Sequence, residues 1–398
     1  MYEKNKIIFV HFNRFLDEFD WKRYELDLLS KKYFIEVHIL INLVHPHLQS
    51  QNYTKFYKNK NIKIFKNFDE WRKKINDYKK NNHFIFQTFP YNFTALKIFR
   101  IIKKKKFKTS IIYINNLPTY DDYKKKINYF ENFYKKFLSI FFRPKHSLAT
   151  LKKIIISFIF KVFSKNLNAD FSLVGGKKKI NYPSKKIIKI NSWDYSNSLR
   201  RNFSTVKNNY ILYLSDGETR HQSDSQLWNT KRVENTKLYL KNLNKFFDAV
   251  EEKYKTKIII AAHPRSNLKL KKDLQLGNRK IFFGQTCKLT KNAKFIISFG
   301  SSALSYAVLY SKPILFIYSS SQQSKNISGN KFSNFFSQIL DCNRVDIDKN
   351  ISENKYLIKK VNSELYRKFK ANYIINLKYM QNYKIISNYI NKLKNISP

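Results

Sequence analysis

The sequence predicts an α/β protein with two doubly wound parallel sheets. Short apolar runs of strand length alternate with amphipathic helical segments along most of the 398 residues, and this alternation indicates parallel strands joined by crossover helices. Several of the runs stop at a polar or acidic turn, which is where open α/β sheets bind their ligands. A chain of this length accommodates two domains, each with its own hydrophobic core.

The first half carries the expected alternation, with no glycine before position 175. We expect strands at 6–11, 34–41, 62–65, 83–87, 110–114, 170–174 and 186–190, and helices at 20–29, 69–78 and 94–103. Asp20 is the expected N-cap of the first helix. All seven glycines lie at position 175 or later, so this half lacks the Gly-rich loop that binds a nucleotide pyrophosphate. These elements predict a first domain at residues 1–190.

A polar, irregular stretch at 191–209 is the expected linker to a second domain at 210–398. In that domain we expect strands at 211–214, 258–262, 280–283, 295–298 and 314–318, helices at 238–254 and 303–309, a loop around 346–348, and a helical tail within 353–396. Two similar α/β halves joined by a linker would enclose a cleft.

The composition excludes several classes of protein. Hydrophobic residues make up 43% of the chain, which is too many for a disordered protein. The formal net charge is +49, a field that attracts polyanions, but the lysines are spread along the chain and no nucleic-acid motif is present. Two cysteines without metal-type spacing favour a reducing, cytoplasmic setting, and no apolar run is long enough for a membrane span or signal peptide.

Residues 121–168 differ from the rest because bulky apolar residues are mixed with lysines there. Phe133, Phe137, Ile140 and Phe141 recur at helical spacing. A basic, aromatic amphipathic helix suits an anionic membrane surface, whereas an ordinary helix packed on the sheet would give the same pattern with its lysines in water. Both interpretations stay open at this stage.

His263 is the first candidate site residue, because it ends the apolar run 258–262 and precedes Pro264 and Arg265. Proline has no N–H and holds the preceding residue in an extended conformation, so the strand should end here. An imidazole at this position can donate a hydrogen bond to a phosphate or protonate a leaving group, and Arg265 adds a planar cation. Although a lone histidine is often structural, this position favours a ligand role.

Two further turns are expected beside it. Gly300, Ser301 and Ser302 precede the helix expected at 303–309. Backbone N–H groups and hydroxyls at a helix start bind phosphate, and glycine permits a close approach, although a serine N-cap alone would give the same pattern.

The third turn holds Asp216, Gly217 and Glu218, followed by His221 and Asp224. A carboxylate at a strand end can accept a proton from an attacking hydroxyl, whereas an Asp-Gly step is also a common turn. The spacing of the acidic and histidine residues matches no standard metal template, so we predict no metal.

The order of these three turns resembles the bacterial sialyltransferases and polysialyltransferases, which have two Rossmann-like domains facing a cleft (the GT-B architecture). The chain as a whole is also similar to glycosyltransferases of bacterial surface-polysaccharide loci. The matching motifs are short and cover residues 20–25, 114–118, 192–195, 261–267 and 302–307. One departure is Ser215, which stands where a second acidic residue is usual before the glycine.

The resemblance implies a role for each turn. Asp216 would be the general base, with Glu218 or His221 as replacements, while His263, Ser301 and Ser302 would hold the donor phosphate. The remaining expected contacts are Gly217, Pro264, Arg265 and Gly300 for the donor and His11, Asn13 and Arg14 for the acceptor.

We therefore expect an inverting, metal-independent glycosyltransferase that needs no cofactor besides its nucleotide-sugar donor. The resemblance favours a CMP-linked sialic-acid-like or Kdo-like sugar and an acceptor in capsule or lipopolysaccharide assembly, at the inner face of the cytoplasmic membrane. The alternatives are a UDP-sugar transferase or sugar-nucleotide epimerase of the same fold, and a basic membrane- or nucleic-acid-binding protein without enzymatic activity.

Overall fold

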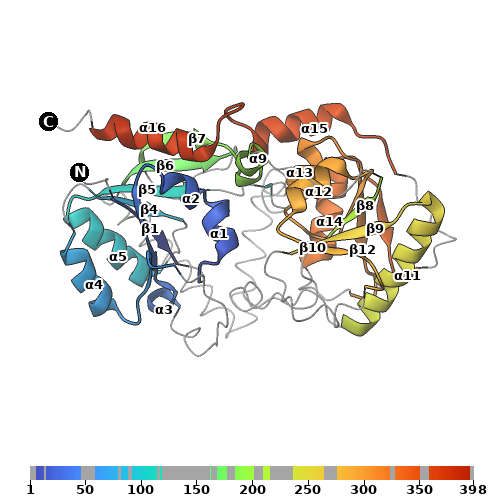
Figure 1. Cartoon of the computed structure of the whole chain (residues 1–398), viewed down its shortest axis with the longest axis horizontal. Helices are drawn as coiled ribbons and strands as arrows, with labels where there is room; N and C mark the ends of the chain where they lie inside the picture. Colours follow the sequence, from blue (N-terminus) through green and yellow to red (C-terminus); the bar gives the residue numbers. More distant parts are fainter. Residues whose placement is uncertain are drawn as a thin grey trace, which may run out of the picture. The chain divides into compact units, whose positions relative to one another are not determined.

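The chain divides into two compact units, Met1–Trp193 with Asn376–Pro398, and Asp194–Ile375. The computed structural model describes residues 6–12, 15–45, 59–78, 82–87, 92–113, 117–118, 162, 168–176, 184–200, 209–215, 236–263, 276–322, 328–349 and 358–394. Each unit is built on its own parallel sheet with helices packed against it (Figure 1). The prediction of two doubly wound α/β units is therefore confirmed.

The first unit holds a seven-stranded sheet in the order β3-β2-β1-β4-β5-β6-β7. Its strands are β1 (Lys6–His11), β2 (Phe34–Ile39), β3 (Ile62–Ile64), β4 (His83–Phe86), β5 (Lys108–Tyr113), β6 (Ala169–Gly175) and β7 (Ser184–Ile190). Its helices are α1 (Glu18–Arg23), α2 (Leu26–Leu29), α3 (Ile41–Val44), α4 (Phe68–Asn76), α5 (Phe93–Lys104) and α16 (Asn382–Lys394). The strand order reverses between β1 and β4, which is the topological switch point of a doubly wound sheet.

Side-chain alternation along β1 explains why helices cover both faces of this sheet. Ile8 and Val10 point into a core that they share with Trp71 of α4 and Phe99 of α5. Phe9 points to the opposite face, where its ring lies 5.2 Å from that of Tyr24 after α1. Because successive side chains of a strand point to opposite faces, a fully apolar strand requires cover on both sides.

The first helices differ in detail from the prediction. α1 begins at Glu18, because the side chain of Asp17, and not that of Asp20, caps it by accepting the N–H of Asp20 at 2.7 Å. The expected single helix at 20–29 is broken after α1, where Glu25 adopts a left-handed conformation with φ 56°. The carboxylate of Glu25 accepts the N–H of Tyr383 in α16 at 2.7 Å, so a tertiary contact holds the break.

The second unit holds a six-stranded sheet in the order β10-β9-β8-β11-β12-β13. Its strands are β8 (Ile211–Leu214), β9 (Ile258–Ala262), β10 (Ile281–Phe283), β11 (Ile296–Ser298), β12 (Ile314–Tyr318) and β13 (Arg344–Asp346). Its helices are α11 (Thr236–Tyr254), α12 (Thr286–Asn292), α13 (Leu304–Leu309), α14 (Ser328–Ile339), α15 (Ser363–Phe369) and the π-helix η4 (Lys370–Ile374). The prediction missed α12, α14 and β13, and it gave 346–348 as a loop.

Among the described residues, helix α11 covers one face of this second sheet. The buried side of α11, including Leu243, Phe247 and Val250, packs against Tyr213 of β8 and Ile260 of β9. Full burial of side chains of this size contributes about 1.5 to 3 kcal/mol each. The long apolar stripe of α11 was visible in the sequence, and it is the part of this unit that sequence periodicity predicts best.

The expected linker and the expected tail are arranged differently from the prediction. Residues 193–198 of the linker form α9 (Trp193–Ser198), with Trp193 fully buried. Residues 376–398, which the sequence placed in the second domain, belong to the first unit. Asn191 holds this returning segment: its Oδ1 accepts the N–H groups of Asn376 and Leu377, both at 2.8 Å, and its Nδ2 donates to the carbonyls of Leu377 and Met380.

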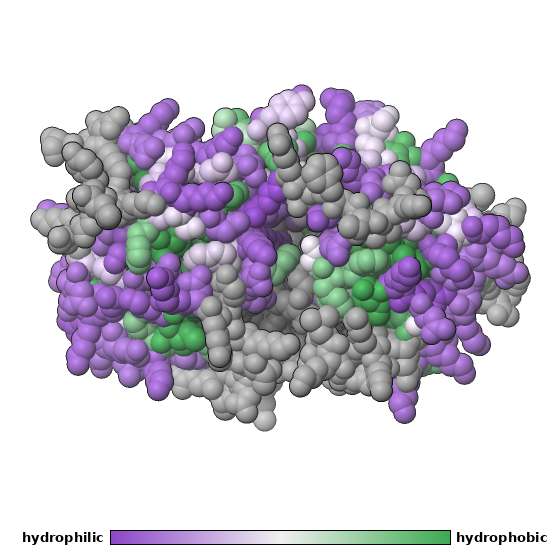
Figure 2. Space-filling view, in the orientation of Figure 1, coloured by the Kyte–Doolittle hydropathy of each residue, from purple (hydrophilic) through white to green (hydrophobic). Residues whose placement is uncertain are grey.

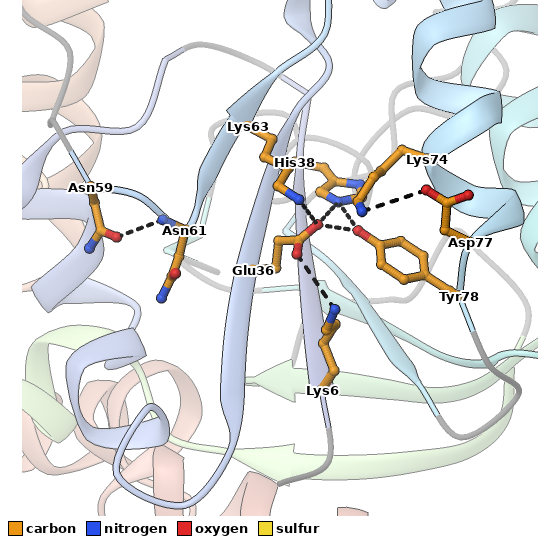
Figure 3. Close-up of polar contacts among 9 residues, drawn as sticks. All are labelled: Lys6, Glu36, His38, Asn59, Asn61, Lys63, Lys74, Asp77 and Tyr78. Carbon is orange, nitrogen blue, oxygen red and sulfur yellow. Dashed lines mark hydrogen bonds and ion pairs between the residues drawn. The ribbon is translucent and has the colours of Figure 1, made fainter. Parts of the chain in front are cut away.

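A polar cluster lies within the first sheet and its neighbouring helix (Figure 3). The buried carboxylate of Glu36 accepts hydrogen bonds from His38 at 2.9 Å and from Tyr78, and it pairs with Lys63 at 3.2 Å. Burial alone would raise the pKa of Glu36, but these hydrogen bonds and positive charges outweigh it and hold the pKa well below its usual range. The cluster is internally paired, so we interpret it as structural.

On the side of the molecule shown in Figure 2, the surface formed by the described residues is mainly hydrophilic, as expected from the charge of the chain. No helix among the described ranges combines the length and apolarity that a membrane span requires. Both cysteines, Cys287 and Cys342, are free.

Candidate functional site

The three turns singled out from the sequence follow neighbouring strands. In the second sheet β8 lies between β9 and β11. Leu214 of β8 is paired with Ala261 of β9 and with Ser298 of β11, so these residues form one row across the sheet. His263 comes two residues after Ala261 and Gly300 two residues after Ser298, so both follow the strands on either side of β8. In the sequence, Asp216 comes two residues after Leu214. Strands lie about 4.8 Å apart, so the chain positions of His263 and Gly300 flank the end of β8.

The end of β9 positions His263. Residues 258–262 are all buried in the sheet and His263 itself is half-buried. The N–H of Ser215, directly after β8, donates to the carbonyl of Ala261 at 3.1 Å, which ties the two strand ends together. Pro264 and Arg265 lie outside the described residues, so the cationic contact expected from Arg265 stays a prediction.

The serine turn after β11 is ordered by its own hydrogen bonds. Ser301 is 6% exposed, and its Oγ accepts the N–H of Ala303 at 3.4 Å, while Ser305 Oγ donates to the carbonyl of Ser302 at 3.2 Å. α13 begins only at Leu304, with Ala303 as its N-cap residue. The serines therefore precede a helix of six residues and do not form its first turn. A ligand at this turn would be bound mainly by the serine hydroxyl groups and less by the start of the helix.

The acidic turn falls outside the part of the chain that the structure describes. This applies to Asp216, Gly217, Glu218 and His221, and only Ser215 before them is placed. The pairing of β8 with its two neighbours fixes where this turn leaves the sheet. Which of the three titratable side chains acts as base stays a prediction.

A second serine turn at the same edge was missed from the sequence. Ser319, Ser320 and Ser321 follow β12, and Asp348 beyond β13 accepts hydrogen bonds from Ser319 Oγ at 2.6 Å and from Ser321 N–H at 2.7 Å. Burial alone would raise the pKa of Asp348, but these hydrogen bonds outweigh it and lower the pKa. The signal was present: like the Gly300–Ser302 turn, these serines directly follow a short apolar run.

Asp346, the last residue of β13, supports the same turn. Its Oδ1 accepts the N–H of Ser320 and that of Asp348, both at 3.1 Å. The side chain is 3% exposed. The two aspartates thus hold the turn, and across the described residues no group of three or more His, Cys, Asp or Glu side chains gathers as a metal centre would require.

The residues expected to contact an acceptor lie at the carboxyl edge of the first sheet. His11 ends β1, is completely buried, and has its ring 6.3 Å from the ring of Tyr24 in an edge-on arrangement. Asn13 and Arg14 follow it and lie outside the described residues. Because His11 offers no exposed surface, Asn13 and Arg14 are the better candidates for a direct contact.

Comparison with known proteins gives similarity in fold only. Neither a scan of family models nor a search of curated proteins returns a match for this chain. Solved structures do match over nearly the whole length. The UDP-GlcNAc 2-epimerase of Methanocaldococcus jannaschii, in complex with UDP-GlcNAc and UDP, is 14% identical, with 97% of this chain and 99% of that chain covered and a TM-score of 0.44.

Two further structures are enzymes of other kinds. The glycotransferase of kitacinnamycin is 8% identical, with 99% of both chains covered and a TM-score of 0.49. The wall teichoic acid polymerase TagF is 11% identical, with 99% of this chain and 89% of that chain covered and a TM-score of 0.49. These structures belong to enzymes with different activities, and a shared fold does not assign an activity.

Proposed function

We propose that this chain is a glycosyltransferase that uses a nucleotide-activated sugar, bound at the carboxyl edge of the second sheet. The observation that supports the proposal is the adjacency of β9, β8 and β11, whose ends carry an imidazole, the start of an acidic turn and a pair of serines. Ligands of open α/β sheets bind outside the carboxyl ends of the strands. The similarity of these turns to bacterial sialyltransferases favours a CMP-linked sialic-acid-like or Kdo-like donor.

The proposed reaction is a direct displacement with inversion at the anomeric carbon. An acceptor hydroxyl forms the new C–O bond while the bond to the leaving phosphate breaks, and the nucleotide departs with that electron pair. Asp216 accepts the hydroxyl proton as general base. His263 and the hydroxyls of Ser301 and Ser302 donate hydrogen bonds to the phosphate as its charge increases, which is the stage at which such donors accelerate the reaction most.

The test is transfer activity against a panel of CMP-, UDP- and GDP-sugars, for the wild type and single variants. We expect His263→Ala, Asp216→Asn and Ser301→Ala to lower turnover, by about 100-fold where a donor to the developing charge is lost. Ser337→Ala is a matched control for the serine, because Ser337 is similarly buried at 7% exposure but lies near the end of α14 that leads into β13.

The outcomes separate the proposal from its alternatives. Donor isomerisation without an acceptor would instead indicate an epimerase, and activity with UDP-sugars alone would reject the CMP-linked donor. Thermal shifts add a check that does not depend on the acceptor, since a nucleotide at 100 times its Kd stabilises by about 2.7 kcal/mol. Stabilisation by an oligonucleotide but by no nucleotide would contradict the transferase proposal.

The proposal includes an acceptor supplied at an anionic membrane surface through residues 121–168. Nearly all of that segment lies outside the described residues, so its support is the mixture of lysines and aromatic residues in the sequence. Flotation with vesicles that contain or lack phosphatidylglycerol tests it. Binding to neither kind of vesicle would reject membrane association.

A further inference from the structure

A basic cavity that is open to solvent lies in the second unit, away from the strand ends that carry the proposed donor site; Lys291 and Lys294 in it are exposed. It has a volume of about 370 Å³ and is lined by Lys291, Lys294, Lys312, Asn209 and Asn292. This volume falls within the range of about 300 to 1,000 Å³ that is usual for ligand sites. Among the lining residues that the structure describes, none has an acidic side chain.

The position of this lysine cavity follows from the sheet. Asn209, Lys294 and Lys312 each stand two residues before a strand, namely β8, β11 and β12. These three strands are neighbours in the sheet and run parallel. The cavity is therefore at the amino edge of the sheet, whereas His263 and Ser301 are at the carboxyl edge, and the two sites do not share residues.

The positive charge of the lysine cavity is not neutralised by the protein groups that the structure describes. The ion pairs of this unit among the described residues join other cations, namely Lys257, Arg279, Lys359 and Lys368, to carboxylates. Burial disfavours the charged form of Lys312 and lowers its pKa. A bound anion would offset this cost.

One lysine has a competing structural explanation. Lys291 stands in the last turn of α12, where a cation stabilises the helix end. Lys294 and Lys312 lie outside any helix, so this explanation does not extend to them. They therefore carry most of the argument for a ligand.

The backbone that presents these two lysines is fixed on several sides. The N–H of Lys294 donates to the carbonyl of Tyr210 at 2.8 Å, and the N–H of Lys312 donates to the carbonyl of Ala307 at 2.8 Å. The carbonyl of Lys312 accepts the hydroxyl of Tyr366 at 3.1 Å, and the hydroxyl of Tyr210 donates to the carbonyl of Leu289 in α12 at 2.8 Å. Because the backbone is already fixed, binding would have to order only the lysine side chains, which lowers its entropic cost.

We propose that the lysine cavity binds a phosphate group. Ammonium groups act as compact cations that bind phosphate, and the amide groups of Asn209 and Asn292 can add hydrogen bonds to its oxygens. A soluble phosphate compound and the headgroup of an anionic lipid present the same chemistry, so the ligand class is a phosphate ester or free phosphate. This site goes beyond the proposed transferase function and does not depend on it.

The experiment compares the full chain with two charge-matched triple variants. The test variant carries Lys291→Gln, Lys294→Gln and Lys312→Gln. The control variant replaces three exposed lysines of α11, Lys237, Lys241 and Lys245, by glutamine, so both lose the same net charge. Binding of inorganic phosphate and pyrophosphate is measured by calorimetry at two salt concentrations, and binding to vesicles with and without phosphatidylglycerol is measured by flotation.

We expect saturable 1:1 binding of at least one of these phosphate probes by the wild type. The test variant should bind that probe about 100-fold more weakly, since each lysine near an anion contributes about a factor of five, and the control should stay within twofold. Binding of the free ions identifies a soluble ligand, and binding only of phosphatidylglycerol vesicles identifies a lipid; both support the proposal. Absence of binding to every probe, or equal weakening in the control, would overturn it.

Discussion

Replacement of Asn191 by alanine should destabilise the first unit by about 3 to 4 kcal/mol. The side chain of this fully buried residue makes four hydrogen bonds to the returning segment, two as acceptor from the N–H groups of Asn376 and Leu377 and two as donor to the carbonyls of Leu377 and Met380. Each such bond contributes about 1 kcal/mol net, and a buried backbone group that loses its partner costs about 1 to 3 kcal/mol. Because the partner groups are only partly buried, water can bond to some of them once the side chain is lost. The expected loss of stability therefore stays near 1 kcal/mol for each of the four bonds.

The comparison variant for Asn191→Ala is Asn67→Ala. Asn67 also bonds a backbone N–H, that of Glu70 at 2.9 Å, but only as the N-cap of α4, so its loss should cost about 1 kcal/mol. Urea unfolding gives the global effect, and hydrogen exchange measured over residues 375–382 gives the local one. If Asn191→Ala costs no more than Asn67→Ala and leaves that exchange unchanged, the side chain does not hold the segment and the reasoning is refuted.

Two further predictions concern pH and the missed serine turn. Burial lowers the pKa of His83 to about 4, below the ~6.5 of a histidine in an unfolded chain, so the unfolded state binds a proton at a higher pH than the folded state does. As the pH falls from 6.5 to 4, the wild type should therefore lose ~3 kcal/mol more stability than His83→Gln. Glutamine is chosen because it keeps a polar partner for Ser110. Parallel urea-unfolding curves across that range would contradict this. Asp348→Ala removes the acceptor of the Ser319 and Ser321 bonds, so amide exchange over 319–322 should accelerate while exchange in α5 of the first unit does not. Unchanged exchange at the turn would show that Asp348 does not order it.

The sequence predicted the sheets well because their signal is local. A parallel strand buried on both faces has to be apolar throughout, and runs such as 211–214 and 258–262 are apolar at every position. The stripe of α11 is equally direct, since its buried residues recur at helical spacing. Boundaries were less certain: the break at Glu25 depends on a hydrogen bond to residue 383, more than 350 positions away.

The candidate site was predicted in part for the same reason. His263 and the turn at 300–302 follow short apolar runs, and that pattern is visible without any structure. The turn at Ser319 has the same pattern, but its importance depends on Asp348, which a long stretch of sequence separates from it. The cavity of Lys291, Lys294 and Lys312 has no sequence signal, because lysines occur throughout this chain.

The sequence by itself determined that this chain forms two parallel α/β units, because strand burial and helix amphipathicity are written in the spacing of neighbouring residues. Only the tertiary structure decided that β8 lies between β9 and β11, that residues 376–398 return to the first unit, and that three lysines share a cavity. The order of the strands and the packing of residues 376–398 on the first unit depend on contacts between residues far apart in the chain. The spacing of neighbouring residues does not predict such contacts.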